Sequence, residues 1–219
     1  MTSNQFRRYT TLPFLLDILH ESRLALLDPA SWEDKNDSYY IELYKTKKNL
    51  KSVLALCFAD SHETYQHWKI YAGNSSGVCI EFNKDHLLNK LVGDHKFKER
   101  QVRYEALKDL RDDPPQIDDL PFIKRFAFSD EQEHRIIYED LDEELKIKYL
   151  PITSRDINRI VINPWVNRSV FESVKTIIKS IKGCKNISVI KSTVVENEKW
   201  KQIGTEALAA KLNQRHHEP

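Results

Sequence analysis

The chain has 219 residues, a length that a single α+β or α/β domain can fill. Hydrophobic residues make up 40% and charged residues 31%, a balance that excludes both a disordered chain and an integral membrane protein. Lysine and arginine number 34 against 33 aspartate and glutamate, so any basic binding surface has to be local.

Hydrophobic periodicity and breaker residues divide the chain into short alternating elements. The sequence begins with a strand over 5–9, followed by a helix that Thr10 or Thr11 caps and that carries Pro13 in its first turn. Further strands are predicted over 24–27, 52–58, 77–82, 102–104, 134–138, 157–162 and 187–190, and further helices over 38–50, 62–72, 85–91 and 168–182. Residues 122–128 fit either a helix or an extended segment. One α+β domain over 1–201 with a polar tail over 202–219 is the expected organisation.

Two residue counts narrow the class of protein. The five glycines are too scattered to form a Rossmann turn or a P-loop, so a bound nucleotide would need another kind of site. Three widely spaced cysteines without a C-x-x-C pair do not fit a disulfide framework or a structural zinc site, and they favour a cytoplasmic location. We expect no metal ion, and no membrane partner because no apolar run has the length of a bilayer span.

Glu131 and Glu133 form the most suggestive group of candidate catalytic residues, and Arg135 follows them. In an extended segment, residues i and i+2 project to the same side. Two carboxylates in one pocket repel, which raises the pKa of one of them, and such a pair suits glycosyl transfer through an oxocarbenium-like cation. The alternative is a solvated acidic loop.

Two further groups have a structural and a functional interpretation. Tyr65, Trp68 and Tyr71 recur at i, i+3 and i+6 of the predicted helix, where they are either core residues or a stacking wall for a planar ring. Three lysines share one face of the helix over 168–182, as either a nucleic-acid contact or a solvated helix face: they are Lys175, Lys179 and Lys182.

Three motifs resemble an uncharacterised bacterial family, domain of unknown function 2971. They are LCFADS at 56–61, HWKIYAGNSSGVCIEF at 67–82 and KRFAFSDEQEHR at 124–135. The resemblance spans residues 6–193 and includes the opening FRRYTT segment. The loop WEDK at 32–35 departs from the family's usual pattern.

More remotely, the early Arg-Tyr-Thr strand, its helix and the late Glu-x-Glu are similar to the ADP-ribosyltransferase superfamily. That resemblance implies a split sheet with flanking helices and a cleft that binds NAD as substrate without a Rossmann turn. Carried over by position, Arg8 and Thr10 would contact NAD, together with Arg135. It also implies that Trp68 or Tyr71 stacks on nicotinamide, that Glu133 is catalytic and that Glu131 orients the acceptor.

The function predicted from these observations is mono-ADP-ribosyl transfer from NAD to a macromolecule, either a nucleic acid (RNA or DNA) or a protein. A toxin or phage-defence effector, controlled by an antitoxin protein, would use such an activity. Two alternatives stay open: an NAD glycohydrolase with water as acceptor, and a non-catalytic module that binds nucleic acid or protein.

Overall fold

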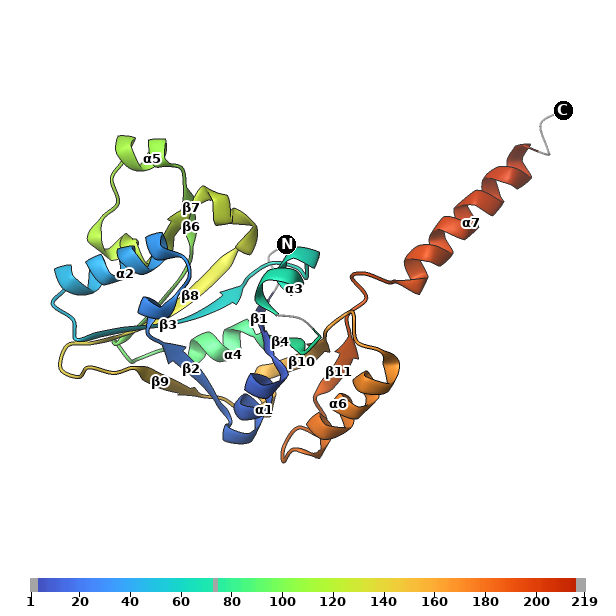
Figure 1. Ribbon diagram of the computed structural model, residues 1–219, viewed down its shortest axis with the longest axis horizontal. Helices are drawn as coiled ribbons and strands as arrows, with labels where there is room; N and C mark the ends of the chain where they lie inside the picture. Colours follow the sequence, from blue (N-terminus) through green and yellow to red (C-terminus); the bar gives the residue numbers. More distant parts are fainter. Residues whose placement is uncertain (1–3, 73–74, 216–219) are drawn as a thin grey trace.

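The computed structural model describes residues 4–72 and 75–215, with side chains as far as residue 208 (Figure 1). The strands are β1 (Gln5–Thr11), β2 (Arg23–Leu27), β3 (Ser52–Ala59), β4 (Gly77–Asn83), β5 (Phe97–Gln101), β6 (Arg103–Glu105), β7 (Ile123–Arg125), β8 (Glu133–Asp140), β9 (Ile147–Pro151), β10 (Ile157–Ile162) and β11 (Ser188–Lys191). The α-helices are α1 (Leu12–Glu21), α2 (Lys35–Lys47), α3 (Tyr65–Tyr71), α4 (Lys84–Asn89), α5 (Leu107–Asp112), α6 (Arg168–Ser180) and α7 (Glu198–Arg215). Four short 3-10 helices join them: η1 (Pro29–Ser31), η2 (Ile117–Phe122), η3 (Phe126–Glu131) and η4 (Ser154–Asp156).

The central sheet is mixed and is split in the middle. Its strands follow the order β11-β10-β4-β1-β3-β2-β9, while β8 pairs with the other edge of β3 and β5 pairs with β8. The ladder between β1 and β3 is reduced to one pair, Arg7 with Ala59, and β2 joins the same edge of β3 at Ala55. The two halves of the sheet therefore separate along the stretch of β3 between these two pairs.

The alternation of side chains along β3 explains why two cores form around it. Leu54, Leu56 and Phe58 face the main core, which α1, α4 and α6 help to cover. Val53 and Ala55 face a second cluster beneath α2, and Cys57 continues on that face beyond the cluster. Period-two alternation thus places Cys57 next to the split and not in the main core.

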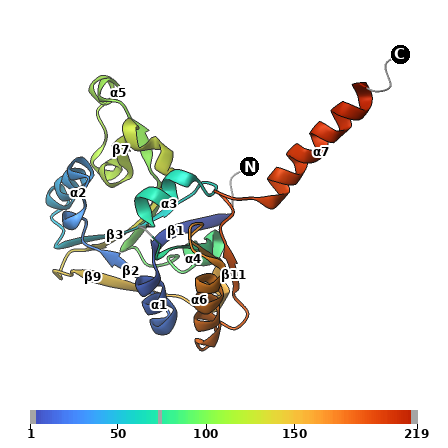
Figure 2. The same ribbon diagram turned by 45° about the vertical axis from the view of Figure 1, so that its right-hand side comes forward.

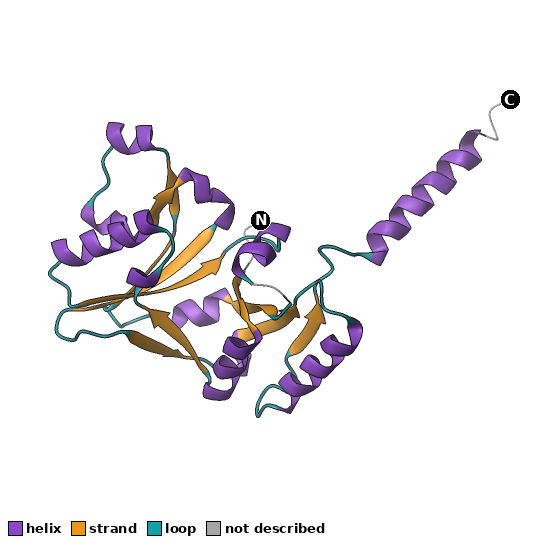
Figure 3. Cartoon of the chain, viewed as in Figure 1, coloured by secondary structure: helices purple, strands orange, loops and turns teal. Residues whose placement is uncertain are grey.

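The predicted α+β class with a mixed, split sheet and flanking helices is confirmed (Figure 3). Three local predictions need correction. The segment 122–128, for which helix and strand were both open, contains the strand β7 between two 3-10 turns. The strand predicted over 102–104 corresponds to β6, and β5 precedes it in a segment for which no strand was predicted. The polar tail predicted over 202–219 belongs, as far as Arg215, to a helix that was not predicted: α7 runs from Glu198 to Arg215 and extends away from the sheet in Figure 1, while the last four residues lie outside the described part.

None of the helices in the described part of the chain is long and apolar enough to cross a bilayer. The three cysteines are free thiols, and two of them, Cys79 and Cys184, are buried.

Candidate active site

A cavity of about 410 Å³ lies where the two halves of the sheet separate. Side chains reach it from β1, β3, α3, the start of α2 and the segment from β7 to β8. Four of the residues predicted from the sequence line it: Arg8, Tyr71, Glu131 and Glu133. These residues come from segments up to 125 positions apart, so only the folded chain brings them together.

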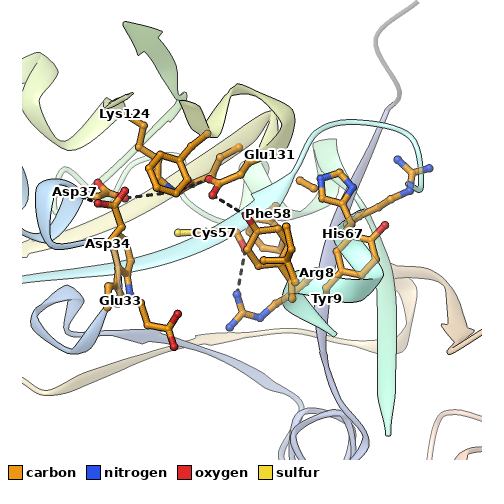
Figure 4. Close-up of a pocket in the computed structure, with 17 residues that line it drawn as sticks. Arg8, Tyr9, Glu33, Asp34, Asp37, Cys57, Phe58, His67, Lys124 and Glu131 are labelled. Carbon is orange, nitrogen blue, oxygen red and sulfur yellow. Dashed lines mark hydrogen bonds and ion pairs between the residues drawn. The ribbon is translucent and has the colours of Figure 1, made fainter. Parts of the chain in front are cut away.

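Arg8 spans the split between the strands. Its Nη1 donates a hydrogen bond to the backbone carbonyl of Cys57 on β3, at 3.1 Å, in the stretch where β3 lacks a neighbour on that edge (Figure 4). Within the described residues, no carboxylate lies within ion-pair distance of the guanidinium, and burial lowers the pKa of Arg8. A half-buried cation without a counter-ion on a cavity wall is suited to bind an anionic ligand.

Glu131 and Glu133 meet around one ammonium group. Lys124 Nζ donates to Glu131 Oε2 and, at 3.3 Å, to Glu133 Oε2. The two glutamates are not in one extended segment as predicted, because Gln132 between them adopts a left-handed conformation with φ of 43°. That residue closes the 3-10 turn η3, and β8 begins at Glu133. Lys124 brings the carboxylates together despite the turn.

Arg135 fixes Glu133 from behind the cavity wall. Its guanidinium is fully buried and donates to Glu133 Oε1 at 2.6 Å and to Glu133 Oε2 at 3.1 Å. On its other side it binds both oxygens of Asp37 from α2, at 2.8 and 2.7 Å, and the carbonyl of Pro121. The planar fork of arginine holds two carboxylates in fixed positions this way.

The environments of the two glutamates shift their pKa values in opposite directions. Burial by itself would raise the pKa of Glu133, but Arg135 and then Lys124 favour the anion and lower the pKa to about 2. Burial raises the pKa of Glu131, and the charge of Glu133 adds to this, although Lys124 and Tyr71 act against it. One carboxylate is therefore held ionised beside another that retains its proton more readily.

The aromatic residues of α3 divide among the core, the cavity and the exposed surface, where Tyr65 lies. Successive residues of an α-helix are about 100° apart, so positions i, i+3 and i+6 spread over about 120° and do not share one direction. Trp68 is fully buried against Tyr9 and donates its indole N–H to Glu63 at 2.5 Å, so it does not line the cavity. Tyr71 does line it, and its hydroxyl donates to Glu131 at 2.6 Å.

Thr10 and Arg135 also do not line the cavity: Thr10 pairs with Val78 in the ladder of β1 and β4, and Arg135 lies behind Glu133. The predicted lysines are on another part of the molecule, and α6 lies beside β11 (Figure 1). The helix ends at Ser180, earlier than predicted, so Lys175 and Lys179 lie on α6 but Lys182 follows it and does not share their helix face. Lys179 donates to the backbone carbonyls of Lys185 and Ile187, whereas Lys182 is exposed. Their contact with a nucleic acid stays a prediction.

Sequence reasoning did not assign roles to Lys124 and Asp37. Both occur in the segments that carry the family resemblance, and both contact the carboxylate network, with Lys124 Nζ 3.6 Å from Asp37 Oδ2. The one available signal for Lys124 was its place at the start of the motif 124–135. Nothing in the local pattern around Asp37 indicated that it would meet Arg135, 98 positions away.

The cavity offers two kinds of chemistry. An ionised carboxylate with fixed partners can stabilise positive charge on a bound group without reorganising. A neighbouring carboxyl group with a raised pKa can accept or return a proton. Among the described residues there is no group of three or more His, Cys, Asp and Glu side chains arranged to hold a metal ion.

The protein is thus of the α+β class, with a charged cavity in a split sheet. The family described as "Protein of unknown function (DUF2971)" matches residues 67–136, about a third of the chain, and confirms the predicted resemblance over that segment. The matched segment contains Tyr71, Lys124, Glu131, Glu133 and Arg135. A comparison with curated proteins finds no match.

Among solved structures, the chain is similar to DarT of Thermus sp. 2.9 in complex with carba-NAD+ at 13% identity, covering 86% of this chain and 95% of that chain with a TM-score of 0.45. For DarT in complex with ADP-ribosylated ssDNA the identity is 12% and the TM-score 0.44, and the match covers 88% of this chain and 98% of that chain. For DarT in complex with NAD+ the identity is 13% and the TM-score 0.44, and the match covers 86% of this chain and 95% of that chain. At this level the likeness concerns the arrangement of elements, and no activity is inferred from it.

Proposed function

We propose that the cavity binds NAD and that the protein transfers the ADP-ribosyl group to a macromolecular acceptor. The observation that carries the proposal is the opposed charge on the two walls of the cavity. An arginine without a counter-ion, Arg8, lies on one side, and Glu131 and Glu133, with pKa values displaced in opposite directions, lie on the other. A phosphate-bearing substrate that develops a cation during reaction matches this arrangement.

The residues fit the parts of the substrate. A cavity of about 410 Å³ is in the range of ligand sites and can enclose the nicotinamide and its ribose, with the rest of the dinucleotide extending outward. Arg8 would bind the diphosphate, because its guanidinium donors match phosphate oxygens. Tyr71 would lie against the nicotinamide ring, as aromatic rings pair in offset or edge contacts.

In the proposed reaction the bond between nicotinamide and C1′ of the ribose breaks, and its electron pair leaves with nicotinamide. The anion of Glu133, held by Arg135, stabilises the positive charge that develops at C1′. The acceptor's nucleophile then bonds to C1′ and gives its proton to Glu131, whose raised pKa makes it the better base of the pair.

The test is incubation with NAD labelled in its adenylate phosphate, followed by separation of DNA, RNA, protein and small molecules. Label in one polymer supports transfer, free ADP-ribose identifies a glycohydrolase instead, and intact NAD supports a binding module. Glu133→Gln keeps the shape of the side chain and removes the charge, so we expect turnover to fall by roughly two to three orders of magnitude. Glu172→Gln, at an exposed position of α6, is the matched control. Unchanged turnover in a folded Glu133→Gln protein contradicts the proposal.

A role as a toxin or defence effector that acts in the cytoplasm would follow from this chemistry, because modified nucleic acid or protein loses function. Induced expression of the parent should then slow bacterial growth, and expression of Glu133→Gln should not. Co-expression of neighbouring genes that restore growth would identify an antitoxin.

A further inference from the structure

An exposed aromatic pair on the far side of α3 plays no part in the cavity. Tyr65 is 47% exposed and Trp165 is 40% exposed, and their rings meet edge to face with centroids 5.7 Å apart. Lys69 Nζ lies 4.3 Å from the centre of the Trp165 ring and 5.5 Å from that of Tyr65. Aromatic rings exposed side by side form a contiguous apolar surface, and such surfaces are found at binding sites.

A groove of about 380 Å³ continues from Trp165. Its lining includes the apolar side chains of Val170 and Val174 from α6, and the residues Ser75 and Ser76, which carry hydroxyl groups. The size and the mixture of a flat ring, apolar side chains and hydroxyl groups suit a planar heterocycle whose edge forms hydrogen bonds.

The charge around the groove favours an anionic partner. Lys69 and Arg168 are exposed, and neither takes part in an ion pair among the described residues. Each nucleotide of a single-stranded nucleic acid carries a planar base and a phosphate. Proteins bind such strands by stacking the bases on aromatic rings beside basic side chains. Lysine is depleted in protein–protein interfaces, so the position of Lys69 beside both rings favours nucleic acid over a protein partner.

The surface of α3 connects this groove with the cavity. Lys69, Gln66 and Ile70 follow one another around the exposed face of the helix, and Ile70 lines the cavity. Figure 2 shows α3 between α2, whose start borders the cavity, and α6, which borders the groove. A strand bound at Trp165 has to cross about one helix diameter, roughly 10 Å, to reach the cavity.

We propose that Tyr65, Lys69 and Trp165 form a docking surface for single-stranded nucleic acid, with one base stacked on Trp165 and a phosphate on Lys69. The identity of this polymer as the acceptor rests on the proposed function, whereas its binding does not.

The test measures binding without NAD, by fluorescence anisotropy of labelled mixed-sequence DNA and RNA oligonucleotides of about 12 nucleotides. We expect Trp165→Ala to weaken binding roughly 5- to 150-fold, the range found for the loss of one stacked base, and Trp165→Phe to retain most of the affinity. Lys69→Gln should flatten the slope of log affinity against log salt by about 0.7. The control is Tyr39→Ala, an aromatic residue of α2 that is 63% exposed.

Unchanged affinity in a folded Trp165→Ala protein overturns the docking surface, as does absence of binding by the parent. Tyr39→Ala should bind the oligonucleotides as the parent does, because Tyr39 lies on α2, outside the docking surface. If oligonucleotide binding depends on Trp165 but NAD is not consumed, this inference holds and the proposed function fails. If NAD is consumed but oligonucleotide binding does not depend on Trp165, the proposed function holds and this inference fails.

Discussion

At the scale of single residues, β1 places two arginines with different roles side by side. Arg7 is buried in an ion pair with Glu81, at 3.0 Å, and Arg159 binds the same carboxylate from β10. Arg8 has a carbonyl as its bonded partner and faces the cavity. Both arginines line the cavity, but Arg7 is held in its ion pair with Glu81, whereas Arg8 has no counter-ion among the described residues and is available to a ligand.

This difference can be measured. Arg8→Met removes charge-assisted hydrogen bonds to a phosphate, so we expect NAD affinity to fall roughly 10- to 100-fold. The melting temperature should change little, because a desolvated cation without a counter-ion is also removed. Arg7→Met, the neighbouring control, should lower the melting temperature because it weakens a buried ion pair. Calorimetric titration with NAD beside a thermal melt gives both readings, and equal affinity in Arg8→Met and the parent would exclude Arg8 from the site.

Glu133 should make the stability of the protein depend on pH. Its pKa in the folded protein is about 2, against an ordinary value of 4.5, chiefly because Arg135 outweighs the effect of burial. A lowered pKa means that the anion stabilises the fold above pH 4.5 and that this contribution is lost as the pH falls from 4.5 to about 2. The melting temperature of Glu133→Gln should therefore lie furthest below that of the parent near neutral pH and approach it below pH 4.5. Melting curves over pH 2–7 test this, and a constant difference would show that the ion pair with Arg135 does not govern the titration.

At the scale of elements, the position of α3 depends on a close approach to the start of β4. A Cβ atom on Gly77 would lie 2.3 Å from the carbonyl oxygen of Ala72, the residue that ends α3. Because the obstacle is backbone, a side chain at this position can be accommodated only if the helix moves.

We expect Gly77→Ala to lower the free energy of unfolding by about 1–3 kcal/mol, the usual effect of overpacking. It should also weaken ligand binding, since Ile70 and Tyr71 of the displaced helix line the cavity. Gly204→Ala is the control, because nothing lies within 4 Å of the added Cβ. Urea denaturation of both variants decides the matter, and equal stability would mean that α3 can shift without loss.

In the whole molecule, the predicted basic surface is separate from the cavity. Lys175 and Lys179 lie on α6, Lys182 follows that helix, and none of the three lines the cavity. The sequence predicts that Lys175, Lys179 and Lys182 contact a nucleic acid, and this stays a prediction. Replacing all three by glutamine should flatten the slope of log affinity against log salt by about two units if each meets a phosphate of a single strand. Because Lys179 already donates to two backbone carbonyls, a smaller change of about 1.4 units is the result that the structure favours. An identical slope in variant and parent would show a solvated helix face.

Local sequence was sufficient for most of the strands and helices and for several residues around the cavity, but not for β5, β9, α5 and α7. Apolar runs such as 52–58 and 77–82 correspond to buried strands. A short continuous run of this kind can be recognised locally, because a strand covered on both faces has apolar side chains in both directions. Arg8, Tyr71, Glu131 and Glu133 were assigned from motifs whose order along the chain can be compared with known families. The helix at 198–215 was missed because its residues have no apolar face that would indicate a packed element.

Only the tertiary structure decided which charges meet and which aromatic ring reaches the cavity. Asp37 contacts Arg135 through the packing of α2 against the sheet, and no pattern in either segment encodes that distance. Trp68 and Tyr71 are three residues apart, and yet one is core and the other lines the cavity. The rotation of a helix fixes the angle between such side chains, whereas the surrounding strands fix which direction is inward. Local sequence specifies the first of these, and long-range packing specifies the second.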